Sequence, residues 1–330
     1  MNKIKWGIMG PGVIAHSFVK GLQALPDATI FAVGARSMEK AAAFAQLYDI
    51  PNVYGSYEEM LKNSEVDIVY IATPHTLHKE CTLMCLKAGK AVLCEKPFTI
   101  NAQEAEEVID YAKKAKLFLM EAMWTRFLPS IVKVRELLKK EVIGQIRQVK
   151  ADFGFCCAWE PENRLLNWRM GGGALLDVGI YTISLASMIL GVQPDKIQSM
   201  AHLGETGVDE QFMAVLGYGD GKMASLSGAI RTDTPQDAWI IGTKGYIQIP
   251  DFWHAASVIL CLKDKPVENI QLPYEATGYG YEAAEAIRCL RQGKLESDIM
   301  PLQESLAIMQ TMDSMRKQWG LAYYKCNDEK

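Results

Sequence analysis

The chain lacks the features that mark membrane, secreted and nucleic-acid-binding proteins. No apolar run free of charge reaches the roughly 18 residues that a membrane-spanning helix needs. The N-terminal segment Lys3–Met9 does not follow the order of a signal peptide. There is no basic block, and the formal net charge is -4. These absences argue against nucleic acid or an anionic membrane as the main partner, and we expect a cytoplasmic protein with a small-molecule substrate.

Metal-binding and disulfide signatures are also scarce. The eight cysteines form no C-x-x-C pair, and several lie in apolar runs where cysteine behaves as a small hydrophobic residue. Cys81 and Cys85 are four residues apart on an expected helix, so they could supply two ligands of a metal site. Only five histidines are present, so we expect no metal.

The length predicts two domains. A chain of 330 residues exceeds the size that one hydrophobic core usually serves, and 49% hydrophobic with 22% charged residues is typical of a globular protein. Internal repeats and low-complexity tracts are absent. A change to aromatic and charged residues at Met123-Trp124-Thr125-Arg126-Phe127 places the boundary there, which gives domains 1–122 and 123–330.

A glycine-rich turn near the N-terminus predicts a dinucleotide site. The strand-like run Ile4–Met9 leads into Gly10-Pro11-Gly12-Val13-Ile14-Ala15, followed by an amphipathic segment to about Leu25. This is the G-x-G-x-x-G/A pattern in its strand–turn–helix context. Gly10 suits the tight turn, Gly12 the close approach of a pyrophosphate, and Ala15 close helix packing, while the helix N-terminus offers free N–H groups. A glycine turn with no ligand is the alternative.

Strand and helix signals alternate through the rest of the first domain. This rhythm predicts βαβ units and therefore a doubly wound α/β domain with a parallel sheet. The expected strands cover residues 29–35, 67–72, 91–94 and 117–122, and the expected helices cover 38–48, 77–87 and 101–116.

The residues after the second strand bear on the cofactor. An Asp or Glu there normally accepts hydrogen bonds from the ribose hydroxyls of NAD, but this chain has Arg36 and Ser37. A guanidinium and a hydroxyl suit a 2′-phosphate, so we expect NADP rather than NAD, although Arg36 could instead only cap the sheet.

Two strand ends carry candidate chemical groups. Glu95-Lys96-Pro97 ends an apolar strand, and ligands bind at the carboxyl ends of parallel strands. Pro97 restricts the backbone before it, so the Lys96 ammonium is directed rather than free. The neighbouring strand ends in Thr73-Pro74-His75, where Thr76 is the expected N-cap of the next helix. His75 then faces the cofactor or substrate, or is structural, whereas we expect His78 on a surface or helix face.

In the second domain, an apolar helix carries two polar groups. The segment Asn167-Trp168-Arg169-Met170 precedes three glycines, after which a helical pattern runs from Gly173 to Leu190. Asp177 and Tyr181, four residues apart, project from one face of an α-helix. Burying them is costly unless they are paired or used. They form either a structural hydrogen bond or a proton-transfer pair, in which Lys96 would stabilise a phenolate.

The remaining sequence predicts an α+β domain with an open, mainly antiparallel sheet. Strand-like runs follow one another without intervening helices, and Gly219-Asp220-Gly221 is typical of a hairpin turn. One sheet face could pack on helices while the other meets a second subunit. The expected strands are 146–155, 197–203, 210–217, 223–229, 238–241, 246–249 and 258–261, and the expected helices are 130–140, 281–291 and 301–319.

Together these motifs resemble the Gfo/Idh/MocA oxidoreductases over essentially the whole chain. The resemblance rests on Gly10-x-Gly12-x-x-Ala15, Glu95-Lys96-Pro97, Trp168-Arg169 and the glycine-rich segment before Asp177 and Tyr181. It implies a Rossmann domain plus an open-sheet domain that mediates oligomerisation, a lysine beside the nicotinamide, and a cis Lys96–Pro97 bond.

One departure narrows the resemblance to a branch. Most members have a histidine where this chain has Tyr181, and tyrosine there is similar to the dimeric dihydrodiol dehydrogenase and NADP-dependent D-xylose 1-dehydrogenase branch. That resemblance implies Lys96 and Tyr181 as proton-transfer groups, oriented by Asp177 with His75 nearby. It further implies a substrate pocket that involves Trp124, Arg126 and Arg169, and a cofactor site that includes Gly10, Gly12, Val13, Ile14, Ala15, Arg36, Ser37, Thr73, Pro74, Glu95 and Lys96.

The expected function is NADP-dependent hydride transfer, with NAD as a possible cofactor, at a secondary hydroxyl or carbonyl of a sugar, cyclic polyol or trans-dihydrodiol. The alternative is a non-catalytic NAD(P)-sensing regulator of the same fold, which would have little need for Lys96, Asp177 and Tyr181 together. A third reading is an enzyme that holds its nicotinamide permanently and interconverts two substrates. We expect a homodimer or higher oligomer formed through the second sheet.

Overall fold

The computed structural model describes residues 2–323, and two compact units divide the chain. The first unit combines Met1–Thr99, Gln103–Phe127 and Tyr274–Ser305. The second combines Ile100–Ala102, Leu128–Pro273 and Leu306–Lys330. The sequence predicted one break after Ala122, whereas in the structure the chain returns to the first unit after the second sheet is complete.

The first unit contains a six-stranded sheet in the order β3-β2-β1-β4-β5-β6, and every pair in it is parallel. This confirms the doubly wound α/β prediction, because the order is that of the dinucleotide-binding fold. The strands β4, β5 and β6 are buried throughout, as expected for a parallel sheet covered on both faces. The strands are β1 Ile4–Met9, β2 Ala28–Gly34, β3 Asn52–Tyr54, β4 Ile68–Ile71, β5 Ala91–Glu95 and β6 Leu119–Ala122.

Six helices accompany this sheet in the described residues: α1 Val13–Gln23, α2 Met38–Tyr48, α3 Tyr57–Leu61, α4 His78–Lys87, α5 Ala102–Ala115 and α8 Gly280–Arg291. The short elements β3 and α3 were not predicted, since so few residues carry little periodicity. The predicted cap at Thr76 is wrong. A 3₁₀ turn, His75–Leu77, contains that residue, and α4 begins only at His78.

The late segment with α8 joins the first unit through a close helix contact. A Cβ atom on Gly21 of α1 would lie 2.6 Å from the backbone nitrogen of Gly280, and one on Gly280 would lie 2.7 Å from the Gly21 carbonyl oxygen. Thr277 adds a hydrogen bond of 2.7 Å from its hydroxyl to the Ser17 carbonyl. Two glycines therefore let the backbones of α1 and α8 meet directly.

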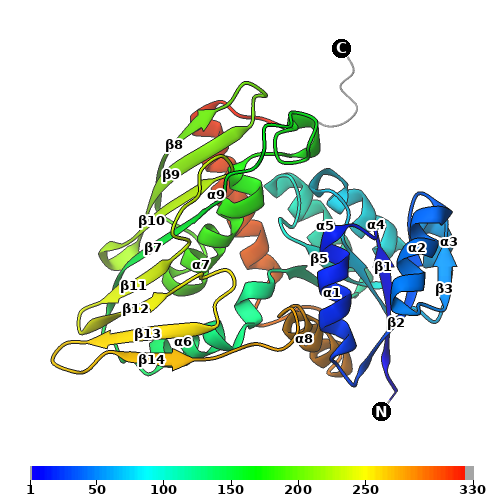
Figure 1. The fold of residues 1–330 in the computed structure, drawn as a ribbon, viewed down its shortest axis with the longest axis horizontal. Helices are drawn as coiled ribbons and strands as arrows, with labels where there is room; N and C mark the ends of the chain where they lie inside the picture. The colour runs from blue at the N-terminus through cyan, green and yellow to red at the C-terminus, as the bar shows by residue number, and fades with distance from the viewer. Residues whose placement is uncertain (1, 324–330) are drawn as a thin grey trace. The chain divides into compact units, whose positions relative to one another are not determined.

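The second unit is built on an eight-stranded sheet in the order β14-β13-β12-β11-β7-β10-β9-β8 (Figure 1). Its pairs are antiparallel except β7 with β10, which is parallel. The prediction of an open, mainly antiparallel sheet is confirmed. The strands are β7 Ile146–Gly154, β8 Lys196–Leu203, β9 Asp209–Tyr218, β10 Lys222–Ala229, β11 Ala238–Gly242, β12 Gly245–Ile249, β13 Ser257–Leu262 and β14 Glu268–Gln271.

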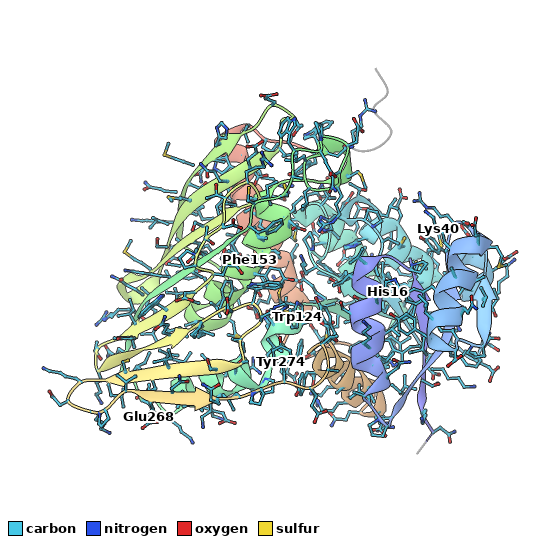
Figure 2. The ribbon with its side chains drawn as sticks, viewed as in Figure 1. His16, Lys40, Trp124, Phe153, Glu268 and Tyr274 are labelled. Atoms are coloured by element: carbon cyan, nitrogen blue, oxygen red, sulfur yellow. The ribbon has the colours of Figure 1, made fainter. Side chains whose placement is uncertain are left out.

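Helices cover one face of this sheet and leave the other open within the second unit. The helices on this face are α6 Pro129–Lys139, α7 Ile180–Leu190 and α9 Leu302–Trp319. A π-helical segment, Leu175–Gly179, directly precedes α7. By length and composition Trp168–Leu190 is apolar enough to cross a membrane, but 89% of the 18-residue apolar window within it is buried inside the structure. It is the core helical segment of the unit. Figure 2 shows side chains projecting from the opposite sheet face, over which no helix formed by the described residues of this unit lies.

Candidate functional site

The turn between β1 and α1 has the geometry of a phosphate cradle. Gly10 has a φ of 88°, and a Cβ atom there would lie 3.1 Å from the Thr73 side chain and 3.2 Å from the Ala72 carbonyl oxygen. Glycine is therefore required at this turn. Ala15, one turn into α1, is fully buried, as the close-packing role of the motif requires.

The N-terminus of α1 leaves its backbone N–H groups without a side-chain cap. Gly12 is the N-cap residue, and the first turn holds no acidic residue. A Cβ atom on Gly12 would meet nothing closer than 3.8 Å, while Val13 is 89% exposed and Ile14 is half-buried. An open helix N-terminus with a positive dipole end fits the pyrophosphate of a dinucleotide.

The end of β2 presents the two residues that the sequence linked to a 2′-phosphate. Arg36 is exposed, and the next residue, Ser37, caps α2 by accepting a hydrogen bond of 3.4 Å from the Lys40 backbone nitrogen. Arg36 thus directly precedes the N-cap residue of a second helix. Both features favour an anionic group at this position.

Glu95-Lys96-Pro97 lies at the carboxyl end of β5, and the Lys96–Pro97 bond is cis, which confirms the expectation. The Glu95 carboxylate is buried, with one oxygen accepting from the Tyr70 hydroxyl and the other from the Lys96 backbone nitrogen at 3.1 Å. Burial raises the pKa of Glu95 to about 7, and these donors and the Lys96 charge oppose the rise. The hydrogen bond to Glu95 fixes the Lys96 backbone, and the residue as a whole is half-buried, so part of it remains exposed to solvent.

His78, expected on a surface or a helix face, is the first residue of α4 but is not on the surface. Its ring is fully buried, with Nδ1 2.8 Å from the Pro97 carbonyl oxygen and Nε2 2.9 Å from that of Thr73. Burial lowers the pKa of His78, while the two carbonyls oppose the shift. The ring thereby ties the loop after β4 to the loop after β5. Its position in the first turn after a strand-end loop was the one signal in the sequence.

The loop after β4 lies in the same edge region, as predicted. Thr73 is buried, whereas Pro74 and His75 are half-buried, and the His75 ring meets the His78 ring edge-on at 5.8 Å between centroids. His75 therefore adjoins the ring that links the two loops. A direct role for His75 in the reaction stays a prediction.

Trp124 and Arg126 have structural partners inside the first unit. Trp124 is fully buried and stacks on Tyr279, with ring centroids 4.5 Å apart. Arg126 is 3% exposed, and its guanidinium pairs with Glu304 at 2.6 Å and donates to the Ile299 carbonyl at 3.2 Å. Their predicted contact with substrate stays a prediction.

In the second unit, Asp177 lies in the π-helical segment and Tyr181 at the start of α7. Both are nearly buried, at 6% and 5% exposure. Arg164, from the long loop after β7, donates a hydrogen bond of 2.7 Å to the Asp177 carboxylate. The sequence predicted a regular α-helix across these residues, and the π-helical geometry changes how Asp177 and Tyr181 are spaced around the axis. Such π segments occur frequently at functional sites.

Aromatic rings surround Tyr181. Its ring centroid lies 5.4 Å from that of Phe153 and 6.3 Å from that of Trp253, and those two rings stack at 4.5 Å. Trp253 is held by a hydrogen bond of 2.7 Å from its indole nitrogen to the Gln236 side chain. Phe153, labelled in Figure 2, belongs to β7, so a sheet strand carries part of this wall.

Arg164, Phe153 and Trp253 were not predicted, because only folding brings Arg164 to Asp177 and the two aromatic rings to Tyr181. The alternation of β7 was the available signal for Phe153, but it predicts the buried face and no particular neighbour. Arg169, predicted to bind substrate, is exposed, and its backbone nitrogen donates to the Asn167 side chain at 3.0 Å.

Residues 2–323 contain no cluster of three or more His, Cys, Asp or Glu side chains suited to a metal ion. Cys81 and Cys85 are both buried free thiols. Burial raises the pKa of Cys81 to about 11 and raises that of Cys85 as well, which disfavours the thiolate that binds metals.

Family models match both halves of the chain. Residues 4–123 match the oxidoreductase family with an NAD-binding Rossmann fold, and residues 131–248 match the GFO/IDH/MocA C-terminal domain. Among curated proteins, trans-1,2-dihydrobenzene-1,2-diol dehydrogenase of Xenopus tropicalis is 40% identical, over 97% of this chain and 99% of that protein. The Mus musculus protein of the same name is 39% identical over 97% of this chain and 98% of its own length.

Solved structures agree with this assignment. A 3-ketoreductase from Actinomadura kijaniata, in complex with NADP and TDP-benzene, superposes with a TM-score of 0.84 at 27% identity, covering 96% of this chain and 98% of its own. An aldose-aldose oxidoreductase from Caulobacter crescentus shares the fold, with a TM-score of 0.88 at 24% identity over 96% of this chain and 97% of its own. The chain therefore belongs to the GFO/IDH/MocA oxidoreductase family.

Proposed function

We propose that this protein is an NADP-dependent oxidoreductase that transfers hydride between the nicotinamide and a secondary hydroxyl or carbonyl of a sugar, cyclic polyol or trans-dihydrodiol. The observation that carries the proposal is the buried, aromatic-walled Tyr181 beside an Asp177 that Arg164 holds in place. The full-length relatives named as trans-dihydrobenzenediol dehydrogenases support the substrate class.

In this mechanism the side chains of the protein transfer the proton and align the substrate with the nicotinamide. Bound nicotinamide supplies the hydride acceptor, at its C4 carbon, for alcohol oxidation. Tyr181 takes the hydroxyl proton of the substrate, and the Lys96 ammonium stabilises the negative charge that the phenol oxygen carries as a base. Asp177 orients the reacting groups, and its ion pair with Arg164 limits its own motion. In the reverse direction Tyr181 returns the proton to the carbonyl oxygen.

The residues of the first unit fit a nicotinamide dinucleotide. The uncapped N-terminus of α1 suits the pyrophosphate, and the exposed Arg36 suits a 2′-phosphate through charge-assisted hydrogen bonds. The 3-ketoreductase of similar structure binds NADP. We therefore propose NADP as the preferred cofactor.

The rings around Tyr181 support a substrate with a flat apolar face. Phe153 and Trp253 stack on each other beside the phenol, and His254 stacks on Trp253 at 3.6 Å. A benzene dihydrodiol and the carbon face of a pyranose both pack well on such a surface. A screen of D-xylose, myo-inositol and trans-1,2-dihydrobenzene-1,2-diol with NADP, followed by NADPH absorbance, identifies the substrate.

The proton-transfer assignment is tested by Tyr181→Phe and Lys96→Met. Each variant loses a group that acts on the reacting proton, so turnover is expected to fall by about 100-fold or more, while NADP affinity measured by calorimetry stays nearly unchanged. Tyr111→Phe in α5 and Lys87→Met at the end of α4 are matched controls with full activity. Wild-type turnover in either test variant would overturn the assignment, and NADP binding without any turnover in the wild type would favour a cofactor-sensing regulator.

The cofactor preference is tested by Arg36→Ala. Because the guanidinium is proposed to bind the 2′-phosphate, which NAD lacks, the variant is expected to raise the KM for NADP by roughly tenfold or more and leave the KM for NAD almost unchanged. Lys20→Ala, at the exposed end of α1, is the control. An equal change in the KM for NADP and in the KM for NAD would show that Arg36 does not bind the 2′-phosphate.

We further propose that a second copy of the chain covers the outer face of the eight-stranded sheet. Alternation places large apolar side chains on this face: Met200, Met213, Val215, Met223 and Tyr246 are 80%, 74%, 43%, 46% and 36% exposed. A sheet face with so much exposed apolar surface is typical of an interface. A homodimer formed face to face would bury it.

A cytoplasmic location is proposed as well. The seven cysteines within the described residues are all free, and four of them are buried, as is usual for proteins of a reducing compartment. Fractionation of cells that express a tagged chain tests this.

A further inference from the structure

The C-terminal segment Leu321–Tyr323 contacts the glycine-rich turn that precedes Asp177. The Trp168 indole nitrogen donates to the Ala322 carbonyl oxygen at 3.1 Å, and the Tyr323 hydroxyl bonds to the Gly172 carbonyl oxygen. The Arg316 guanidinium of α9 lies over the Tyr323 ring, 5.1 Å from its centroid. The segment Leu321–Tyr323 is thus anchored on the turn between Trp168 and the π-helical segment.

Asp209 completes this network from the start of β9. Its carboxyl group is fully buried, and it accepts a hydrogen bond of 2.6 Å from the Leu175 backbone nitrogen at the beginning of the π-helical segment. Its other oxygen lies 3.4 Å from the Tyr323 hydroxyl. A Cβ atom on Gly173, whose φ is 117°, would lie 2.1 Å from that same oxygen, so the turn admits only glycine there.

The hydrogens of this network can be assigned from the donors and acceptors. The Tyr323 hydroxyl has one hydrogen, and the Gly172 carbonyl can only accept, so that hydrogen goes to Gly172. The contact between Tyr323 and Asp209 is then a hydrogen bond only if the Asp209 carboxyl carries a proton and donates it to the phenol oxygen. When Asp209 is ionised, it competes with Gly172 for the single hydrogen of Tyr323.

We propose that Tyr323 and Asp209 are positioning residues of the site: through Gly172 and Leu175 they hold the turn from which the helical segment carrying Asp177 and Tyr181 starts. This inference rests on the proposed function for its catalytic consequence, but its structural part does not. The segment Leu321–Tyr323 then belongs to the structure that supports the site.

The protonation of Asp209 gives the network a pH dependence. Burial raises the pKa of Asp209 to about 7, while the Leu175 N–H group, the Arg316 charge and the Tyr323 hydroxyl oppose the rise. Arg316 and Tyr323 are the charged and titratable side chains that face it from α9 and the C-terminal segment. Below pH 7 the protonated carboxyl lets Tyr323 bond to Gly172, and above pH 7 the carboxylate draws the Tyr323 hydrogen away.

The first test compares two shortened chains. A chain ending at Leu321 loses both the Ala322 carbonyl and Tyr323, whereas a chain ending at Tyr323 keeps them and is the matched control. Hydrogen exchange of the backbone amides of Leu175–Gly179 in the cofactor-free protein is expected to become faster only in the shorter chain. Equal exchange in the two chains would overturn the positioning role, whether or not the proposed activity exists.

The second test uses Tyr323→Phe, which removes one hydroxyl and keeps the ring over Arg316. With trans-1,2-dihydrobenzene-1,2-diol and NADP, we expect kcat to fall about tenfold and the KM for NADP to stay the same, because the loss is one of alignment. Unchanged kcat together with unchanged hydrogen exchange would overturn the proposal. Absent turnover in the wild type counts against the proposed function alone, since the exchange measurement still decides the positioning role.

The third test uses Asp209→Asn as the conservative variant. An Asn side chain can accept from Leu175 and donate to the Tyr323 oxygen at every pH, as the protonated carboxyl does, whereas Ala can do neither. We expect Asp209→Asn to keep kcat near the wild-type value at pH 6 and to exceed it at pH 8.5, and Asp209→Ala to lose activity at both. A constant ratio of wild type to Asp209→Asn across this range would overturn the assigned hydrogens.

Discussion

At the scale of single residues, the first unit buries three carboxyl groups whose pKa values are raised. Glu95 and Glu121 are buried at the ends of adjacent strands, and burial raises the pKa of each to about 7. Glu282 of α8 is fully buried, and neither of its oxygens has a hydrogen-bond partner among the described residues. Burial, and then the nearby Glu95 charge, raise the pKa of Glu282 well above its usual range. Burial therefore favours the protonated form of the Glu282 carboxyl in the folded protein.

Replacing Glu282 with Gln is expected to change how stability depends on pH. In the unfolded chain Glu282 ionises near pH 4.5, whereas burial raises its pKa in the folded protein, so the wild type loses stability as pH rises from 4.5 toward the folded pKa. One such group contributes about 1.4 kcal/mol per pH unit over that window. Gln cannot ionise, so urea unfolding between pH 5 and 8 should show a flatter dependence for the variant.

The control for this prediction is Glu106→Gln, on the exposed side of α5. That variant should keep the pH dependence of the wild type, because the Glu106 side chain contacts water in the folded and in the unfolded protein. Parallel curves for the wild type and Glu282→Gln would mean that the Glu282 carboxyl is ionised in the folded protein.

The site residues that the sequence predicts are set by local chain chemistry, whereas those that it does not predict are set by long-range contacts. Gly10, Gly12 and Lys96 follow from local chemistry, since a turn conformation and a strand end are properties of a short segment. Arg164 and His78 acquire their partners only through folding, because Asp177 is 13 residues from Arg164 and Pro97 is 19 from His78. No periodicity in the sequence encodes such pairs.

At the scale of elements, sequence periodicity predicts where the helices and strands lie, and tertiary packing determines which of them pair. The strands and helices of both units were largely predictable, since alternation and 3.6-residue patterns are local. The parallel pairing of β7 with β10 and the return of α8 to the first unit are long-range contacts, and the sequence pattern of neither element specifies its partner. The π-helical segment was missed because its composition matches that of an α-helix.

The contact between α1 and α8 yields a prediction at this scale. Gly21→Ala adds a methyl group 2.6 Å from the Gly280 backbone nitrogen, which cannot move without shifting α8. Alanine favours a helix by about 1 kcal/mol over glycine, but forced displacement of packed backbone costs more, so we expect a net destabilisation of about 1–3 kcal/mol. Urea unfolding followed by circular dichroism measures it.

Gly219→Ala is the matched control for this substitution. A Cβ atom there meets nothing within 4 Å, so the turn between β9 and β10 should accept it with little change in stability. If Gly21→Ala were as stable as Gly219→Ala, the close approach of the two helices would not be a constraint on the fold.

At the scale of the whole molecule, the outer face of the eight-stranded sheet is the surface through which the proposed dimer would form. Met200 of β8 and Met213 of β9 are direct cross-strand neighbours, and the Trp239 and Tyr246 rings of β11 and β12 lie 5.4 Å apart. Apolar pairs therefore extend along the sheet from one side to the other. Water contact with such a surface is unfavourable, and pairing two identical faces removes it for both copies.

Met213→Glu is expected to convert the proposed dimer into a monomer. Residue 213 is 74% exposed in the single chain, so the charge costs nothing there, but it would be desolvated when two faces meet. Light scattering after size exclusion at micromolar concentration should give twice the chain mass for the wild type and the chain mass for the variant. Val267→Glu, 63% exposed in the turn between β13 and β14, is the control that should stay dimeric. A wild type that elutes as a monomer would show that this face has another occupant or none.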